Sequence, residues 1–167
     1  MVEEQIDWRK TVEAILENAN RPFVPISKSF IQQPRGSKER SSVLSQFVTN
    51  GDLRGLKAYL LIAASASSPD TDNEWYTSLP LQTWARAFGC SETAGSVATA
   101  KAAATRILLR LQQRGLIEKS RCGKERKIKI KLLAQDGSGE EYQRPASRYI
   151  RLSHDFWKSR FDEDISL

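Results

Sequence analysis

The stretch from Thr105 to Ile117 decides the fold, and it reads Thr-Arg-Ile-Leu-Leu-Arg-Leu-Gln-Gln-Arg-Gly-Leu-Ile. The spacing of its leucine and isoleucine residues predicts an amphipathic helix that ends at Gly115, because glycine commonly follows the last turn of a helix. Leu116 and Ile117 then begin a hydrophobic segment typical of a strand. The surrounding residues 97–131 contain eleven Lys or Arg and two Glu, so the basicity of the chain is concentrated here.

Three further helices and a short strand are predicted between residue 43 and this stretch, and the first of these helices is short and spans residues 43–49. One helix begins after Asp52, whose side chain is expected to cap it, and its apolar residues extend beyond one side, which predicts burial. Residues 75–78 predict a strand, and residues 80–88 predict a helix that ends at Gly89. The order of elements from Trp84 to Ile117 is therefore helix, glycine turn, helix and strand.

The long helix before Gly115 can begin at a cap formed by Ser91 or Ser96, because serine accepts hydrogen bonds from the first free amide groups of a helix. At about 100° per residue, one of its faces is apolar and is predicted to pack inward. The inward residues are Val97, Ala100, Ala104, Ile107, Leu108 and Leu111. The predicted outward residues are Thr99, Ala102, Arg106, Leu109, Arg110 and Gln113.

Residues 116–121 and 127–133 predict two strands joined by a turn at residues 122–124. Isoleucine and leucine alternate with lysine in the second strand, so one face is expected to pack and the other to be cationic. The lysines of that outer face are Lys127, Lys129 and Lys131.

The two ends of the chain predict additional elements. Residues 3–19 have the apolar spacing of a helix, and residues 154–161 predict an aromatic helix. Residues 23–30 read as an extended segment broken at Pro25. The same eight-residue pattern returns at residues 149–156, with two identities and three conservative apolar pairs, which indicates a weak internal repeat.

The composition narrows the function classes. The 167 residues carry a formal net charge of +6, which fits a polyanionic partner. Two cysteines and one histidine do not give a zinc-ligand spacing, and no Gly-Lys-Ser/Thr phosphate loop is present. The N-terminus lacks the pattern of a signal peptide, and the longest apolar run is too short for a membrane span. The sequence therefore predicts a cytoplasmic, nucleoid-associated protein with no membrane partner, catalytic residue, metal or cofactor.

Residues 105–117 resemble the end of the recognition helix in winged-helix bacterial regulators, whose pattern is Ser-Arg, two helical turns with leucine, and Gly-Leu-Ile. Thr105 replaces the usual serine and keeps a hydroxyl group. The resemblance implies an α+β fold with a mainly helical winged helix-turn-helix core, a small antiparallel sheet or wing, and an N-terminal helical extension. The implied domains are residues 1–42 (helix and linker), 43–152 (winged helix-turn-helix) and 153–167 (aromatic helix, possible start of a second domain).

The resemblance implies a sequence-specific protein for double-stranded DNA, with the helix in the major groove and the wing on adjacent backbone. A role in transcriptional regulation is expected. The implied DNA-binding residues of the helix are Ser96, Thr99, Thr105, Arg106, Arg110 and Gln113. Those of the wing are Arg121, Lys124, Arg126 and Lys127.

Three alternatives remain open at the level of sequence. The repeat is compatible with the first half of a tandem winged-helix protein, a layout similar to plasmid replication initiators, and partition is a related role. Winged helices also serve as protein-interaction modules, which would here use Leu109, Trp157 and the N-terminal helix. The helix at residues 3–19 is expected either to form a homodimer or to pack on its own core.

Overall fold

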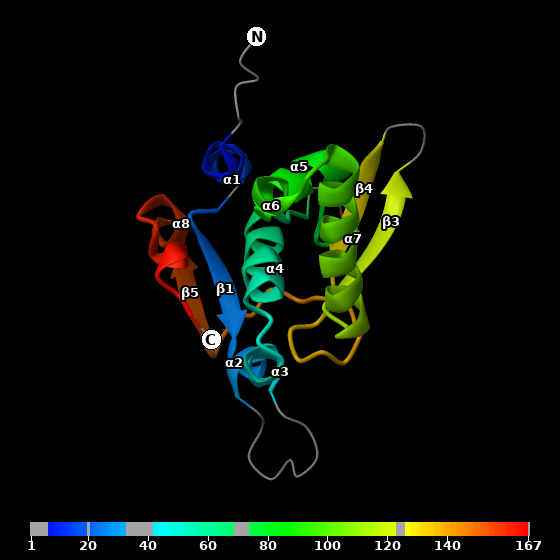
Figure 1. The fold of residues 1–167 in the computed structure, drawn as a ribbon. Coiled ribbons are helices and arrows are strands. Elements are labelled where there is room, and N and C mark those ends of the chain that lie inside the picture. Colours follow the sequence, from blue (N-terminus) through cyan, green and yellow to red (C-terminus); the bar gives the residue numbers. More distant parts are fainter. Residues whose placement is uncertain (1–6, 20, 33–41, 69–73, 123–125, 167) are drawn as a thin grey trace.

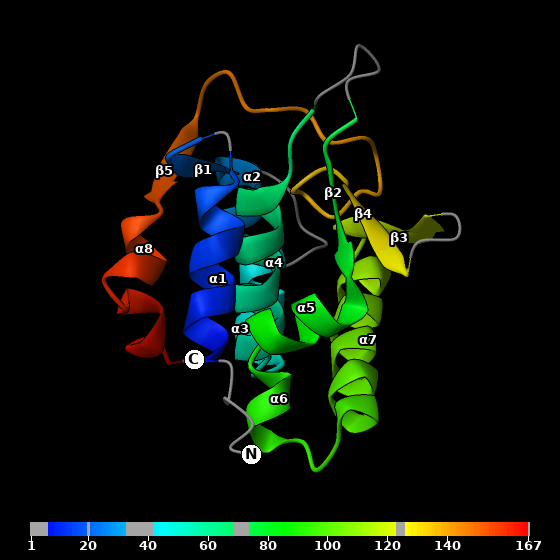
Figure 2. The ribbon, with the colours of Figure 1, turned by 90° about the horizontal axis from the view of Figure 1, so that it is seen from above.

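The computed structural model describes residues 7–19, 21–32, 42–68, 74–122 and 126–166. They form a mixed fold of helices and two small antiparallel sheets, which confirms the α+β prediction (Figures 1 and 2). The helices are α1 (Trp8–Glu17), α2 (Lys28–Ile31), α3 (Val43–Thr49), α4 (Leu53–Ser65), α5 (Leu81–Ala87), α6 (Cys90–Thr93), α7 (Val97–Gln113), α8 (Asp155–Lys158) and the 3-10 helix η1 (Phe161–Glu163). The strands are β1 (Phe23–Ser27), β2 (Tyr76–Pro80), β3 (Ile117–Cys122), β4 (Lys127–Leu132) and β5 (Tyr149–Ser153).

Helix α4 forms the centre of the fold. Its residues from Gly55 to Ala64 are buried except for Lys57, as expected from an apolar surface that extends beyond one stripe. In both views, β5 and α8 lie on one side of α4, while α7 and the β3–β4 hairpin lie side by side on the other (Figures 1 and 2). The three-stranded sheet has the order β2-β4-β3, so β3 is an edge strand.

Local sequence signals set the helix boundaries. The Asp52 carboxylate accepts a hydrogen bond from the backbone N–H of Gly55, and the Ser96 hydroxyl accepts one from Thr99, so both predicted caps are confirmed. Gly89 and Gly115 follow α5 and α7 with φ angles of 71° and 72°, the left-handed conformation that glycine adopts at little cost.

Three local predictions were wrong. The turn after Gly89 contains the short helix α6, so Ser91 lies within a helix and caps nothing. Pro25 lies inside β1 and does not break the extended segment, which instead ends at Ser27, immediately before helix α2. Val97 is 56% exposed instead of inward, since the first turn of α7 extends beyond the core.

The two copies of the repeat pair with each other. Strands β1 and β5 are antiparallel, with Val24 opposite Leu152 and Ile26 opposite Ile150. Each strand is followed directly by a short helix. The serine at the end of each strand accepts a hydrogen bond from the amide two residues later, Ser27 from Ser29 and Ser153 from Asp155. The repeat therefore forms a two-stranded ribbon whose halves match in strand, serine turn and helix.

The N-terminal and C-terminal helices pack onto the same core as α4. Val12, Ile15 and Leu16 of α1 are buried within the chain, as is Trp157 of α8. The apolar stripe expected for a dimer or a partner is therefore covered by the chain's own core. The residues before Asp7, with which the predicted N-terminal helix starts, lie outside the described part. Within the described residues, the helices fall short of the length and apolarity that a membrane crossing requires.

Candidate nucleic-acid interface

Helix α7 presents one packed and one exposed face. Ala100, Ala104 and Leu108 are buried against the fold, and the alanines let α7 approach α5 closely. On the opposite face, Thr99, Ala102 and Arg106 are exposed, and small residues dominate its first half. Leu109 is exposed by 43%, as predicted for an outward position. The exposed face of α7 is thus slim at its start and cationic further along.

Three hydroxyl groups that the sequence assigned to this face are bonded to α7 itself. The Ser96 hydroxyl caps the helix and shares a hydrogen bond of 2.9 Å with the Thr99 hydroxyl. The Thr105 hydroxyl donates to the carbonyl oxygen of Lys101 at 2.9 Å, and the residue is half-buried at the side of the helix. These three hydroxyl groups therefore stabilise α7 itself, in addition to the DNA contacts that the resemblance implies for them.

Arg106 is the exposed cation at the middle of the outer face. It forms no hydrogen bond or ion pair with any residue that the structure describes. Burial raises the pKa of the Cys90 thiol, and the positive charges of Arg54, Arg106 and Arg110 oppose that rise. Three arginines from α4 and α7 therefore lie within electrostatic range of the same thiol and form a local positive region.

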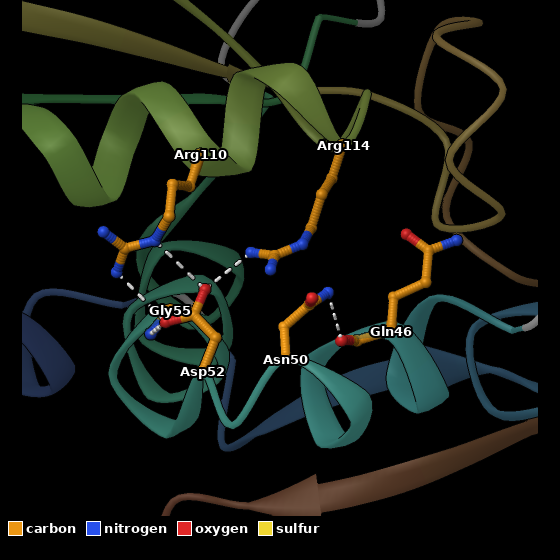
Figure 3. A network of polar contacts seen from close by, with 6 residues as sticks. All are labelled: Gln46, Asn50, Asp52, Gly55, Arg110 and Arg114. Carbon is orange, nitrogen blue, oxygen red and sulfur yellow. Dashed lines mark hydrogen bonds and ion pairs between the residues drawn. The ribbon is translucent and has the colours of Figure 1, made fainter.

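Arg110 is not a free cation, although the sequence assigned it to the groove. Its Nη2 and Nε atoms donate to the two carboxylate oxygens of Asp52 at 3.0 and 3.2 Å. Arg114 donates to the same carboxylate at 2.6 Å (Figure 3). Its guanidinium group also stacks over the Phe47 ring at 4.4 Å. Arg110 and Arg114 thus connect the last turns of α7 to Asp52 at the start of α4. Arg110 therefore has a structural role in the fold. Gln113, one position before Arg114, is exposed.

The Asp52 carboxylate is held in its charged form. Burial alone would raise its pKa, but hydrogen bonds from Arg110, Arg114 and the Gly55 amide together lower the pKa below its usual value. The side chain is 10% exposed, so these bonds replace most of its hydration. A negative charge thus neutralises part of the positive charge at the C-terminal end of α7.

The outer face of the sheet is less cationic than the sequence predicts. Lys129 pairs with Glu74 at 3.1 Å, and Lys131 pairs with Glu74 and Glu141 at 3.4 Å each. Lys129 also lies over the Tyr76 ring at 4.4 Å. The alternation along β4 was predicted correctly, but acidic residues from other parts of the chain neutralise two of its three lysines.

The far end of the β3–β4 hairpin keeps exposed arginines. Arg121 and Arg126 are exposed and form no ion pair within the described residues, and Lys127 is exposed at the start of β4. Lys124, a further expected contact, lies outside the described residues. Arg121 and Lys119 stand opposite Ile128 and Ile130, so both share the sheet face that packs toward α7. Lys119 was not among the DNA-binding residues expected from the sequence, although the alternation of side chains along β3 places it on the same face as Arg121.

The site therefore contains fewer cations than the sequence assigned. Arg106 on α7 and Arg121, Arg126 and Lys127 on the hairpin remain exposed, while Arg110 is tied to Asp52. No family model, curated protein or solved structure matches this chain. Among the described residues, no group of His, Cys, Asp and Glu side chains is arranged to hold a metal ion.

Proposed function

We propose that this chain is a non-enzymatic, sequence-specific protein for double-stranded DNA that acts in transcriptional regulation. In this proposal, α7 enters the major groove and the β3–β4 hairpin contacts the adjacent phosphates. The observation that carries the proposal is the exposed Arg106 in the middle of the outer face of α7, which forms no ion pair with any residue that the structure describes. The order α4, β2, α5, α6, α7, β3, β4 also supports it, since apart from the short helix α6 it is the order that the winged-helix resemblance implies.

The dimensions and chemistry of α7 suit a groove. Its 17 residues make a rod of roughly 25 Å, and the major groove admits one helix. Thr99 and Ala102 allow the helix backbone to approach the base edges closely. Arg106 can donate two hydrogen bonds to guanine, and Leu109 can contact the methyl group of thymine. The base contacts would thus come from the middle of α7.

The hairpin suits the phosphate backbone. Lys119 and Arg121 lie on the sheet face that packs toward α7, and Arg126 is exposed just before β4. With Arg106, these residues provide four cations, so the logarithm of the binding constant should fall with the logarithm of salt concentration at a slope of about −3 to −4.

Fluorescence anisotropy with a random-sequence duplex at several salt concentrations tests the proposal. We expect binding that weakens steeply with salt, and Arg106→Ala should weaken it about 5-fold or more while the circular dichroism spectrum stays unchanged. The matched control is Arg151→Ala, which removes the same charge from β5 on the opposite side of α4 (Figure 1). An absence of binding at low salt, or equal losses in both variants, would contradict the proposal.

A further inference from the structure

A cavity of about 180 Å³ lies between the two ends of the chain and the central helix. Residues from α1, α4, the end of α5, α8 and η1 line it. The residues that matter for its chemistry are Trp8, Arg54, Lys57, Phe88, Trp157 and Asp162. It lies apart from the exposed face of α7, so the proposed DNA interface does not account for it.

The walls of the cavity are largely apolar, and three of the lining residues are aromatic. Trp8, Phe88 and Trp157 come from three separate elements and surround the space together with aliphatic side chains of α4. A cavity of roughly 150 Å³ with apolar walls is large enough to hold a benzene-sized ring. The apolar part of the space therefore fits the body of one small molecule.

A negatively charged residue, Asp162, and two positively charged residues, Lys57 and Arg54, line the same cavity without forming an ion pair with each other. Asp162 is only 4% exposed, and no side chain that the structure describes donates a hydrogen bond to it. Burial raises the pKa of Asp162, and the nearby charge of Lys57 opposes this without forming an ion pair. Arg9, the other cation near Asp162, is bonded to Glu163 at 2.7 Å. Among the described residues, the Asp162 carboxylate thus has a backbone donor but no side-chain donor, and Lys57 and Arg54 have no side-chain acceptor.

We propose that this cavity binds a zwitterion of amino-acid size with an apolar side chain. Its ammonium group would donate to Asp162, and its carboxylate would accept from Lys57 or Arg54. Its side chain would pack among the three aromatic rings. One ligand would then pair with both of the opposite charges that line the cavity, while its apolar body leaves water. A ligand with only a positive charge would pair with Asp162 but give Lys57 and Arg54 no partner. A ligand with only a negative charge would give Asp162 no partner.

Isothermal titration calorimetry with three probes tests this proposal on the unmodified protein. L-phenylalanine has both charged groups, phenethylamine lacks the carboxylate, and 3-phenylpropionate lacks the ammonium group. We expect L-phenylalanine to bind with a Kd on the order of 1 mM or tighter, and each analogue to bind about 10-fold more weakly. No binding of L-phenylalanine, or equal binding of either analogue, would overturn the proposal.

Variants assign the two charges to residues. Asp162→Asn should weaken L-phenylalanine binding about 10-fold or more, whereas the matched control Asp164→Asn, an exposed acid two residues later, should not change it. Lys57→Met should weaken L-phenylalanine and leave phenethylamine unaffected. Unchanged binding by Asp162→Asn would reject the site. Because the analogue series uses the unmodified protein, it tests the proposal even if a variant fails to fold. None of these measurements depends on DNA binding.

Discussion

Asp52 and Arg110 form a two-pronged ion pair between helices that start 44 residues apart, at Leu53 and Val97. The same carboxylate caps α4 and accepts a third side-chain bond from Arg114. One acidic side chain therefore fixes the start of the central helix and the end of the helix that carries the proposed interface.

Replacing Asp52 by Asn should lower the free energy of unfolding by about 2–3 kcal/mol, because two arginines would lose their charged partner. Urea denaturation at neutral pH measures this change. Asp136→Asn is a suitable control: Asp136 is exposed, and its oxygen accepts a turn hydrogen bond that an amide oxygen can also accept. A loss below about 0.5 kcal/mol for Asp52→Asn, the usual size of a surface effect, would show that the network contributes little.

The same network should make stability depend on pH. Since the pKa of Asp52 is lowered in the folded chain, its stabilising contribution is present above the unfolded value of about 3.9 and is lost as the pH falls through the folded value. The difference in unfolding free energy between the unmodified protein and Asp52→Asn should therefore shrink below about pH 4. A difference that stays constant from pH 7 to about pH 3 would contradict this origin.

Gly115 should tolerate substitution far less than Gly51. Both have positive φ angles, 72° and 61°, which cost a side-chain-bearing residue roughly 1–2 kcal/mol. A Cβ atom at Gly115 would also lie 2.6 Å from the carbonyl oxygen of Gly137, whereas nothing lies within 4 Å of one at Gly51. Gly115→Ala should thus reduce the thermal midpoint clearly more than Gly51→Ala. Similar reductions would mean that the Gly137 turn moves away easily.

The hairpin cations should divide into two groups in DNA binding. Replacing Arg121 and Arg126 together by Ala should make the salt slope less steep by about 2, since both are exposed and form no ion pair with the residues that the structure describes. The double replacement of Lys129 and Lys131 by Ala should change the slope by less than about 1, because both lysines are already paired with acidic residues. Anisotropy titrations in parallel compare the two. The reverse order would place the DNA on the outer face of the sheet.

Ser96→Ala should reduce stability by about 1 kcal/mol through the loss of the α7 cap. Ser91 is exposed within α6 and makes no capping bond, so Ser91→Ala should change stability by less than about 0.5 kcal/mol. Chemical denaturation of both variants provides the comparison. Equal effects would mean that the Ser96 cap does not determine where α7 begins.

Rules that involve a few neighbouring residues predicted much of the fold. The caps at Asp52 and Ser96 and the glycines after α5 and α7 depend on backbone groups within three or four positions, and all four were confirmed. By contrast, Glu74 lies more than fifty positions from Lys129. Which acid neutralises which base is decided by packing of distant elements, so the sequence overestimated the positive charge of the wing.

The pairing of the two repeat segments is another contact between distant parts of the chain that the sequence did not predict. The sequence revealed two similar segments, and their similarity indicated a second, separate unit. It carried no signal that the two segments pair, because strand pairing is set by the path of the whole chain between them. The cavity was also invisible, since Trp8, Phe88 and Trp157 come together only when both ends of the chain pack on α4.

The pairing of β1 with β5 also sets an order for events during synthesis. Strand β1 leaves the ribosome before its partner, residues 149–153, which is made only after the whole intervening segment. Val24 and Ile26, buried in the finished fold, must stay uncovered by that partner while residues 28–148 are made. The slowest step in forming this ribbon is then the arrival of its second half, and a nascent chain halted before residue 149 would display an unpaired apolar strand to chaperones and proteases.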